Sequence, residues 1–384
     1  MILRNARVAL APAHAAQADI EARAGRFQTI GRVPGRIGLD LAGYIVLPGL
    51  INAHDHLEFN LFPRLGSGIY LSCAEWARDI HRTRADVINE IRAVPKTHRL
   101  IWGGLKNLVS GVTTVCHHNP WEKIFSQRFP VRVLRNFAWA HSLEFSPDLA
   151  VKFTACPPSK PFIFHAGEAV DGPGRGEMAA LRTLGVLAPN AVLVHAVALN
   201  GESLKLAGRN SCAIVWCPSS NLFMLGQTLS AEVLRDSGLP IALGTDSAVT
   251  AEGDMFDELR VARLVSGLPQ ERLYRMVTDI AARILRLHNG AGTITPGGVA
   301  DFVVFPDCGD TPAEVIFGSR PEAVFIGGRL QLASSAFAAR FARSFPSIER
   351  FHRLTVADRG RFLIRSEAPA LPPNMRLAGK EVAA

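Results

Sequence analysis

The stretch LPGLINAHDH, residues 47–56, decides how the rest of this chain is organised. The apolar run 44–50 predicts a buried strand bounded by Pro48-Gly49. His54 and His56 follow it, and side chains two residues apart on an extended segment point the same way. Imidazole is a good ligand for zinc and iron, so the pair is a candidate half of a metal site. The alternative is two ordinary polar residues at the end of a strand.

The size and composition of the chain are those of a globular protein. Its 384 residues allow one large domain and a smaller one, with 48% hydrophobic and 20% charged residues. No uninterrupted apolar run reaches the roughly 18 residues that span a membrane. Residues 1–8 carry charge within an apolar stretch, which does not suit a signal peptide. The six cysteines are scattered without CxxC spacing, so we expect reduced thiols and a cytoplasmic protein without membrane contact.

The formal net charge of +8 raises the question of nucleic acid binding. Such binding needs basic residues clustered with elements that read a groove or stack on bases. Here the arginines are spread through the chain, with a mild concentration after residue 335. We therefore expect a small-molecule substrate and no nucleic acid partner.

The two ends of the chain carry short alternating β patterns. Residues 1–48 and residues 290–335 each contain too few strands for a core of their own. We expect them to pair into one small, discontinuous β-sandwich. Residues 336–384 are Arg-rich and then Pro-rich, and they predict a C-terminal helix followed by an irregular tail.

Residues 49–289, between these ends, alternate strand-like and helix-like runs. Such repeats imply a parallel sheet covered by helices. After the strand before His54, the expected strands are residues 113–116, 131–140, 151–156, 162–164, 191–194, 212–216 and 240–243. Eight strands predict an α/β fold of the closed (β/α)8 TIM-barrel type.

One side of this expected barrel is abbreviated. Only 19 residues separate His141, at the end of the third expected strand, from Pro161, before the fifth. A helix, a strand and a second helix do not fit there at typical connection lengths. We expect that side to be open, or covered by a second subunit in a homodimer.

Polar residues end several of the expected strands. His165 ends the fifth, His195 the sixth and Asp246 the eighth, while His54 and His56 follow the first. One polar strand end is readily explained as a partner for a loop. Four of them, each after an apolar run, indicate a shared site, because functional groups in such barrels lie at the carboxyl ends of the strands.

The order of these motifs resembles that of the amidohydrolase superfamily, in the branch that contains guanine deaminase, adenosine-type deaminases and triazine hydrolases. The resemblance covers about residues 1–330. The matching motifs are PGLINAHDH (48–56), HAGE (165–168), VHA (194–196), CPSSN (217–221) and GTDSA (244–248), followed by the segment 254–260.

The resemblance implies a hydrolase with one divalent metal ion. His54, His56, His165 and Asp246 would bind the ion, with zinc expected and iron as the alternative. Asp246 would also accept a proton from the attacking water, which His195 would orient. Glu168 would protonate a ring nitrogen and then the leaving group. The expected reaction is hydrolytic deamination of an amino-substituted N-heterocycle.

Members of the superfamily with two metal ions bridge them with a carboxylated lysine or a glutamate from the fourth strand. Lys152 lies at the wrong end of the expected fourth strand, which favours a single ion. Cys156 lies nearer the expected site, and a thiolate contact from it is kept as an alternative.

Four further residues are candidates for substrate contacts: Asn60, His118, His141 and Arg175, the last in a glycine-rich loop. Burial with a hydrogen bond explains His118 and His141 equally well. Ser220-Asn221 resembles a turn of the superfamily and is better explained as a loop cap.

Other activities suit the same centre. Cyclic amide hydrolysis and ring C–Cl hydrolysis are the alternative reactions, and a non-catalytic binding protein on a degenerate barrel is the remote one. No expected ligand position is missing from the sequence. The substrate itself does not follow, because this fold and metal set serve many chemistries.

Overall fold

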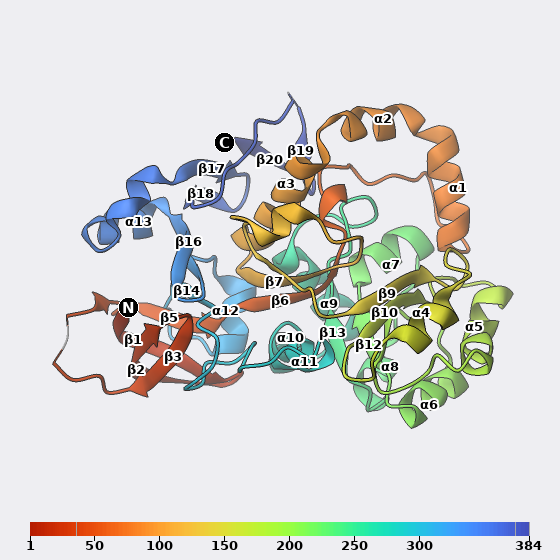
Figure 1. Ribbon diagram of the computed structural model, residues 1–384, viewed down its shortest axis with the longest axis horizontal. Helices are drawn as coiled ribbons and strands as arrows, with labels where there is room; N and C mark the ends of the chain where they lie inside the picture. Colours follow the sequence, from red (N-terminus) through yellow and green to blue (C-terminus); the bar gives the residue numbers. More distant parts are fainter. Residues whose placement is uncertain (36, 373, 384) are drawn as a thin grey trace.

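The computed structural model describes residues 1–35, 37–372 and 374–383, without the side chains of Pro173 and Arg175. It is an α/β structure with parallel sheets next to a large, mostly antiparallel sheet (Figure 1). Among the described residues, no helix is long and apolar enough to cross a membrane.

Two parallel sheets carry the strands of the middle segment. The first contains β6 (Leu50–Asp55), β7 (Val112–His117) and β8 (Arg132–Val133). The second contains β9 (Ala138–Ser142), β10 (Phe162–Ala166), β11 (Ala191–His195), β12 (Ala213–Trp216) and β13 (Ile241–Leu243). Most of these residues are buried and apolar, as expected for strands that helices cover.

The edge strands β6 and β13 of the two sheets lie against each other. The Asp246 N–H just after β13 donates to the His54 carbonyl at 3.0 Å. Gly244 makes this approach possible, since an added Cβ would lie 2.7 Å from the His54 Cβ and 2.9 Å from its carbonyl oxygen. The glycine of the GTDSA motif therefore brings the two ends of the strand series together.

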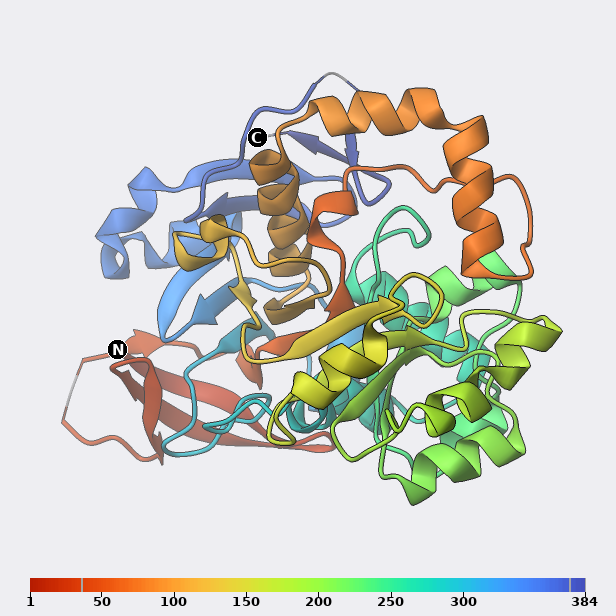
Figure 2. The same cartoon turned by 45° about the vertical axis from the view of Figure 1, so that its right-hand side comes forward.

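Helices follow most of these strands. Their bounds are α3 (Lys96–Val109), α4 (Leu149–Ala155), α5 (Gly172–Thr183), α6 (Gly201–Arg209), α7 (Pro218–Leu225), α8 (Ala231–Asp236), α9 (Met255–Ser266), α10 (Gln270–Met276) and α11 (Asp279–Ile284). Before α3 come α1 (Cys73–Thr83) and α2 (Ala85–Ala93), which form an arm above the carboxyl ends of the strands (Figure 2). Short 3-10 turns span Leu57–Phe59 and Lys123–Ser126.

The structure corrects the predicted third and fourth strands. The run 131–140 forms two strands, β8 and β9, which belong to different sheets. The predicted strand 151–156 is wrong, because this segment lies largely in α4. Leu149 and Phe153 of α4 pack on the core at a spacing of four residues, while Val151 and Lys152 are exposed, and that spacing is helical. A single helix, α4, therefore connects β9 to β10, and in the described part of the chain β8 and β9 are not paired with each other.

The helical segment 270–284 is interrupted. It forms α10 and α11, with a break at Val277 and Thr278. The Val277 carbonyl accepts a hydrogen bond from the Ile51 N–H of β6 at 2.8 Å. At the break, this carbonyl therefore bonds to the neighbouring strand and not within a helix.

Strands from both ends of the chain share one 12-stranded sheet. The antiparallel pairing of β5 (Tyr44–Pro48) with β14 (Phe302–Pro306) joins them. The N-terminal part comprises β1 (Ile2–Ala11), β2 (His14–Arg23), β3 (Arg26–Gly31) and β4 (Leu39–Asp40). The C-terminal part comprises β15 (Ala323–Ile326), β16 (Arg329–Ser334), β17 (His352–Val356), β18 (Gly360–Ile364), β19 (Arg376–Leu377) and β20 (Lys380–Ala383).

The C-terminal segment is more ordered than predicted. It contains α13 (Ser335–Phe341) and 3-10 turns at Ala342–Ser344 and Pro346–Arg350, and α12 (Pro312–Gly318) precedes it. In place of an irregular tail, β17 to β20 extend the large sheet. Leu354 and Val356 are buried, while Arg353 before them and Thr355 between them are exposed, which is the two-residue period of a strand with one solvated face.

Candidate metal centre and active site

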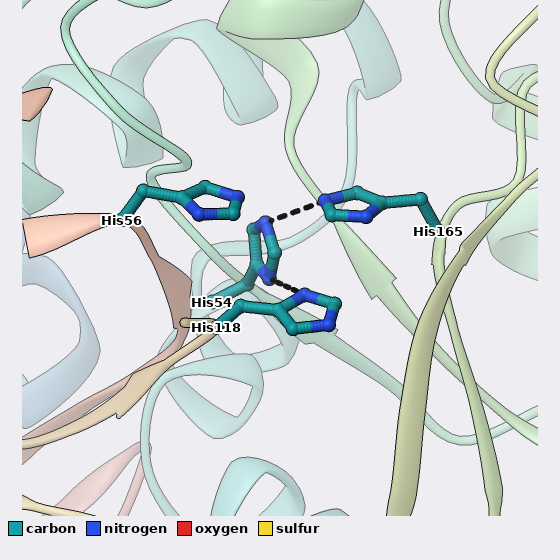
Figure 3. Close-up of side chains that lie close together, drawn as sticks. All are labelled: His54, His56, His118 and His165. Atoms are coloured by element: carbon teal, nitrogen blue, oxygen red, sulfur yellow. Dashed lines mark hydrogen bonds between the residues drawn. The ribbon is translucent and has the colours of Figure 1, made fainter. Parts of the chain in front are cut away.

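Four buried histidines converge where the parallel strands end. His54 and His56 come from β6 and the residue after it, His118 follows β7, and His165 lies in β10. One nitrogen of each lies within 4.8 Å of one nitrogen of every other (Figure 3). Imidazoles gathered in this way form a site that fits a divalent metal ion.

Asp246 adds a carboxylate to this cluster. Its Oδ1 lies 3.6 Å from His54 Nε2 and 3.7 Å from His56 Nε2. Its Oδ2 accepts hydrogen bonds from the hydroxyls of Ser220 at 2.6 Å and Thr250 at 2.9 Å. The two hydroxyls therefore hold Oδ2, and Oδ1 faces the histidines.

His118 reaches the cluster through His54 Nδ1, whereas Asp246 and His165 face His54 Nε2. His118 Nδ1 lies 3.3 Å from His54 Nδ1, and its Nε2 lies 3.0 Å from the Ala140 carbonyl (Figure 3). His54 therefore uses its Nδ1 toward His118 and turns its Nε2 toward Asp246 and toward His165 Nε2, which is 3.3 Å away. His165 Nδ1 in turn donates to the His141 carbonyl at 2.8 Å.

The environment keeps His54, His118 and His165 neutral, which is the form that binds a metal ion. Burial lowers the pKa of His54 to about 4. Burial, together with neighbouring imidazoles, also holds the pKa values of His118 and His165 well below the usual range. Burial alone would raise the pKa of Asp246, but its hydrogen bond with His54 and the nearby imidazoles hold that pKa well below the ordinary value.

His195 and Glu168 stand next to the cluster. His195 Nδ1 lies 2.7 Å from Asn221 Oδ1, which fixes the ring, and its Nε2 lies 3.3 Å from Glu168 Oε1 without an aligned hydrogen bond. Burial raises the pKa of the Glu168 carboxyl, despite the opposing influence of His195. A carboxyl with a raised pKa is suited to donate a proton near neutrality.

A cavity of about 210 Å³ opens beside these groups. His56, His165, Glu168, His195 and Asp246 line one part of it. The remaining lining residues include Phe59, Phe62, Leu65, Trp76, Ile80, His81, Arg92, His141 and Val249. Reactive groups at one wall of a largely apolar cavity are typical of a small-molecule site.

The predicted substrate contacts fare differently from one another. His141 lines the cavity. Asn60 and His118 are not among the described residues that line it. The Asn60 amide donates to Asp55 Oδ1 at 2.8 Å, and the His118 ring contacts His54 and the Ala140 carbonyl. The Arg175 side chain lies outside the described part of the chain. Cys156 bonds to the Lys160 carbonyl at the end of α4 and is remote from the cavity lining.

Sequence reasoning missed a buried polar network behind the histidines. Asp55 Oδ2 lies 3.0 Å from the Lys106 ammonium of α3 and accepts from Asn107 at 2.8 Å. Lys106 also donates to Thr245, the residue before Asp246, at 3.0 Å. Lys106 and Asn107, inside the otherwise apolar run 100–109, are the signal that could have revealed this network. Ser220-Asn221, expected to be a loop cap, bonds instead to Asp246 and His195.

Comparisons with known proteins agree with this arrangement. The model of the amidohydrolase family matches residues 163–330. The 5-methylthioadenosine/S-adenosylhomocysteine deaminase of Syntrophobacter fumaroxidans is 26% identical over 324 residues, which cover 69% of this chain and 73% of that protein.

Solved structures share the fold at low sequence identity. A zinc-bound adenosine deaminase from Xanthomonas campestris aligns with a TM-score of 0.65 at 18% identity, covering 91% of this chain and 98% of that one. The zinc complex of atrazine chlorohydrolase from Arthrobacter aurescens TC1 aligns with a TM-score of 0.69 at 18% identity, covering 86% and 94%. The motifs, the site and these matches agree in their similarity to the amidohydrolase superfamily, whose family model covers residues 163–330.

Proposed function

We propose that this protein is a metal-dependent hydrolase that deaminates an amino-substituted N-heterocycle. The observation that carries the proposal is the convergence of His54, His56, His165 and Asp246 beside Glu168 and the cavity. We propose these four residues as the ligands of one divalent ion, zinc in preference to iron.

The separations of the four donor groups fit such an ion. Around a tetrahedral zinc with ligand bonds of about 2.1 Å, neighbouring donor atoms lie about 3.4 Å apart. The separations here are 3.3 Å for His54 Nε2 to His165 Nε2, and 3.6 and 3.7 Å from Asp246 Oδ1 to His54 and His56. His118 faces His54 Nδ1 and not the Nε2 that faces Asp246 and His165, and its own Nε2 bonds to the Ala140 carbonyl, so we assign it the role of holding His54.

The bound ion would supply an activated water near neutral pH. Asp246 is placed to accept the proton of this water, since its Oδ1 faces the histidines while Ser220 and Thr250 hold its Oδ2. His195, held by Asn221, borders the cavity and is placed to orient the water and to favour the negative charge that develops during attack.

Glu168 is the proposed general acid. Its carboxyl lines the cavity, and burial raises its pKa, so the protonated form is available for transfer. It would protonate the ring nitrogen next to the carbon under attack. After receiving the proton that Asp246 took from the water, it would protonate the departing amino group, which leaves as ammonia, and the hydroxyl proton released as the carbonyl forms would restore the acid. The relative named a 5-methylthioadenosine/S-adenosylhomocysteine deaminase supports deamination as the reaction.

The architecture is part of the proposal. We propose that the two parallel sheets form one (β/α)8 barrel, interrupted between β8 and β9, at residues 49–289. Contact between β6 and β13 supports this closure. We further propose that residues 1–48 and 290–335 form a separate β domain, to which residues 336–384 add strands. A small-molecule substrate suits the size of the cavity better than nucleic acid.

The test is a screen of ammonia release by zinc-loaded protein with amino-substituted purines, pyrimidines, pterins and triazines. Ammonia from at least one of these supports deamination. Chloride from a chlorinated triazine, or ring opening of a cyclic amide, without ammonia from any substrate would instead support one of the two alternative reactions.

A further inference from the structure

Helix α1 forms one long wall of the cavity. Cys73, Trp76, Ala77 and Ile80 line it at spacings of three and four residues, which is one face of a helix. The Cys73 N–H donates to the Glu168 carbonyl at 3.1 Å, so the helix begins at the catalytic end. His81, which also lines the cavity, lies eight residues further, about 12 Å along the helix axis.

Much of the cavity lining is apolar. Phe59, Phe62, Leu65 and Val249 line it together with the α1 face. The Trp76 indole N–H donates to the Leu65 carbonyl at 2.6 Å, which ties α1 to the segment that follows the metal-site histidines. A ligand there meets aromatic and aliphatic side chains along this stretch.

The charges that line the cavity are separated by sign. The carboxylates are Glu168 and Asp246, both at the catalytic end. His81 lies in the last turn of α1, and Arg92 lies in the last turn of α2, the helix that follows α1; both line the cavity. Within the described part of the chain, the Arg92 side chain has neither an ion-pair partner nor a hydrogen bond. Its five N–H donors are therefore available to a ligand.

We propose that the substrate is an amino-heterocycle with an apolar body and an anionic group, such as a carboxylate, at the end remote from the amino group. Arg92 binds that anionic group. This inference rests on the proposed function, because the deaminated ring must occupy the end that Glu168 lines. A planar guanidinium matches a carboxylate with two parallel hydrogen bonds.

A matched pair of probes tests the role of Arg92: 5-(adenin-9-yl)pentanoic acid and its primary amide, which differ in the negative charge at the tail. Equilibrium binding is measured by calorimetry on zinc-loaded protein carrying Glu168→Gln, so that neither probe is consumed. We expect the acid to bind about tenfold more tightly than the amide, as one charge-assisted contact provides. Adding Arg92→Gln should bring this affinity ratio close to one, and Arg92→Lys should preserve part of it.

Arg82→Gln is the control, because Arg82 is exposed, pairs with Asp79 and is outside the described cavity lining. It should leave the ratio unchanged. Equal affinities for the acid and the amide, including no binding of either, overturn the inference, as does a ratio that survives Arg92→Gln. Ammonia release by the unmutated protein reports separately on the proposed function. An acid-to-amide affinity ratio of one, together with ammonia release, therefore overturns this inference and leaves the proposed function standing.

Discussion

The Lys106 ammonium lies 3.0 Å from the Asp55 carboxylate, and both side chains are buried. Asp55 separates His54 from His56 in the chain, and Lys106 also contacts Thr245, which precedes Asp246. The pair therefore connects β6, α3 and the segment after β13, the three parts whose positions determine the metal-site geometry. Supporting contacts of this kind orient the groups that bind a metal ion.

Lys106→Met should destabilise the protein strongly, because it leaves the Asp55 carboxylate buried without its cation. The expected loss in free energy of unfolding is about 3–5 kcal/mol, measured by urea denaturation of metal-free protein. Lys152→Met is the control: Lys152 pairs with Asp148 at 3.1 Å, but both side chains are exposed, so its loss should cost about 1 kcal/mol or less. Equal losses for the two variants would contradict a special role for Lys106.

His118→Asn should weaken metal binding without removing the site. His118 contacts His54 Nδ1, so its loss should lower the zinc affinity by about 10–100-fold while one ion per chain still binds at saturation. His165→Asn, in contrast, removes a proposed ligand and should abolish stoichiometric binding. Competition with a chromophoric chelator measures both affinities, and an equal loss for both variants would make His118 a ligand.

Asn221→Leu should lower the turnover number much more than it lowers metal content. Asn221 Oδ1 lies 2.7 Å from His195 Nδ1, and without this partner the ring is free to turn away from the cavity. We expect a fall of about tenfold or more in kcat, by analogy with other orienting contacts. Asn221→Asp keeps an acceptor oxygen and should recover part of the rate, and activity equal to that of the unmutated protein in Asn221→Leu would exclude the orienting role.

Glu258 should make the protein less stable as the pH rises from about 5 to about 8. Burial raises the pKa of this carboxyl to about 8, so in that range the folded state holds a proton that the unfolded state has released. Unfolding then releases a proton, and the free energy of unfolding falls with pH by up to about 1.4 kcal/mol per pH unit.

Glu258→Gln should remove this contribution, so that its stability relative to the unmutated protein improves as the pH rises through this window. Denaturation series at pH 5, 6, 7 and 8 on metal-free protein measure the difference. Glu90→Gln, at an exposed position of α2, is the control and should show no such trend. A constant difference between Glu258→Gln and the unmutated protein would show that Glu258 is ionised throughout.

The sequence predicted the strands that are buried on both faces. The runs ending at His165, His195 and Asp246 are continuous and apolar, and they form β10, β11 and β13 close to the expected bounds. The error around residues 131–156 has a physical reason, because short apolar runs do not distinguish a strand from a helix. Helices α1 and α2 were missed, since their mixed charges conceal a narrow apolar face.

The sequence motifs predicted which residues form the site, but not the contacts that hold them together. The spacing of His54 and His56 follows from the geometry of a strand, but their approach to His165 and Asp246 depends on strands far apart in the chain. The roles of Asn60 and His118 were not predictable, because both depend on hydrogen bonds to α3 or to neighbouring strands. Likewise, the pairing of Ser220 with Asp246 requires the fold itself.

The most direct test of the central claim is ammonia release from the best heterocycle of the screen, measured before and after removal of the metal ion with a chelator. The account predicts about one zinc or iron ion per chain, loss of activity on its removal, and recovery when one equivalent of zinc is returned. Asp246→Asn should remain inactive in all three states. Undiminished ammonia release by metal-free protein would contradict the account.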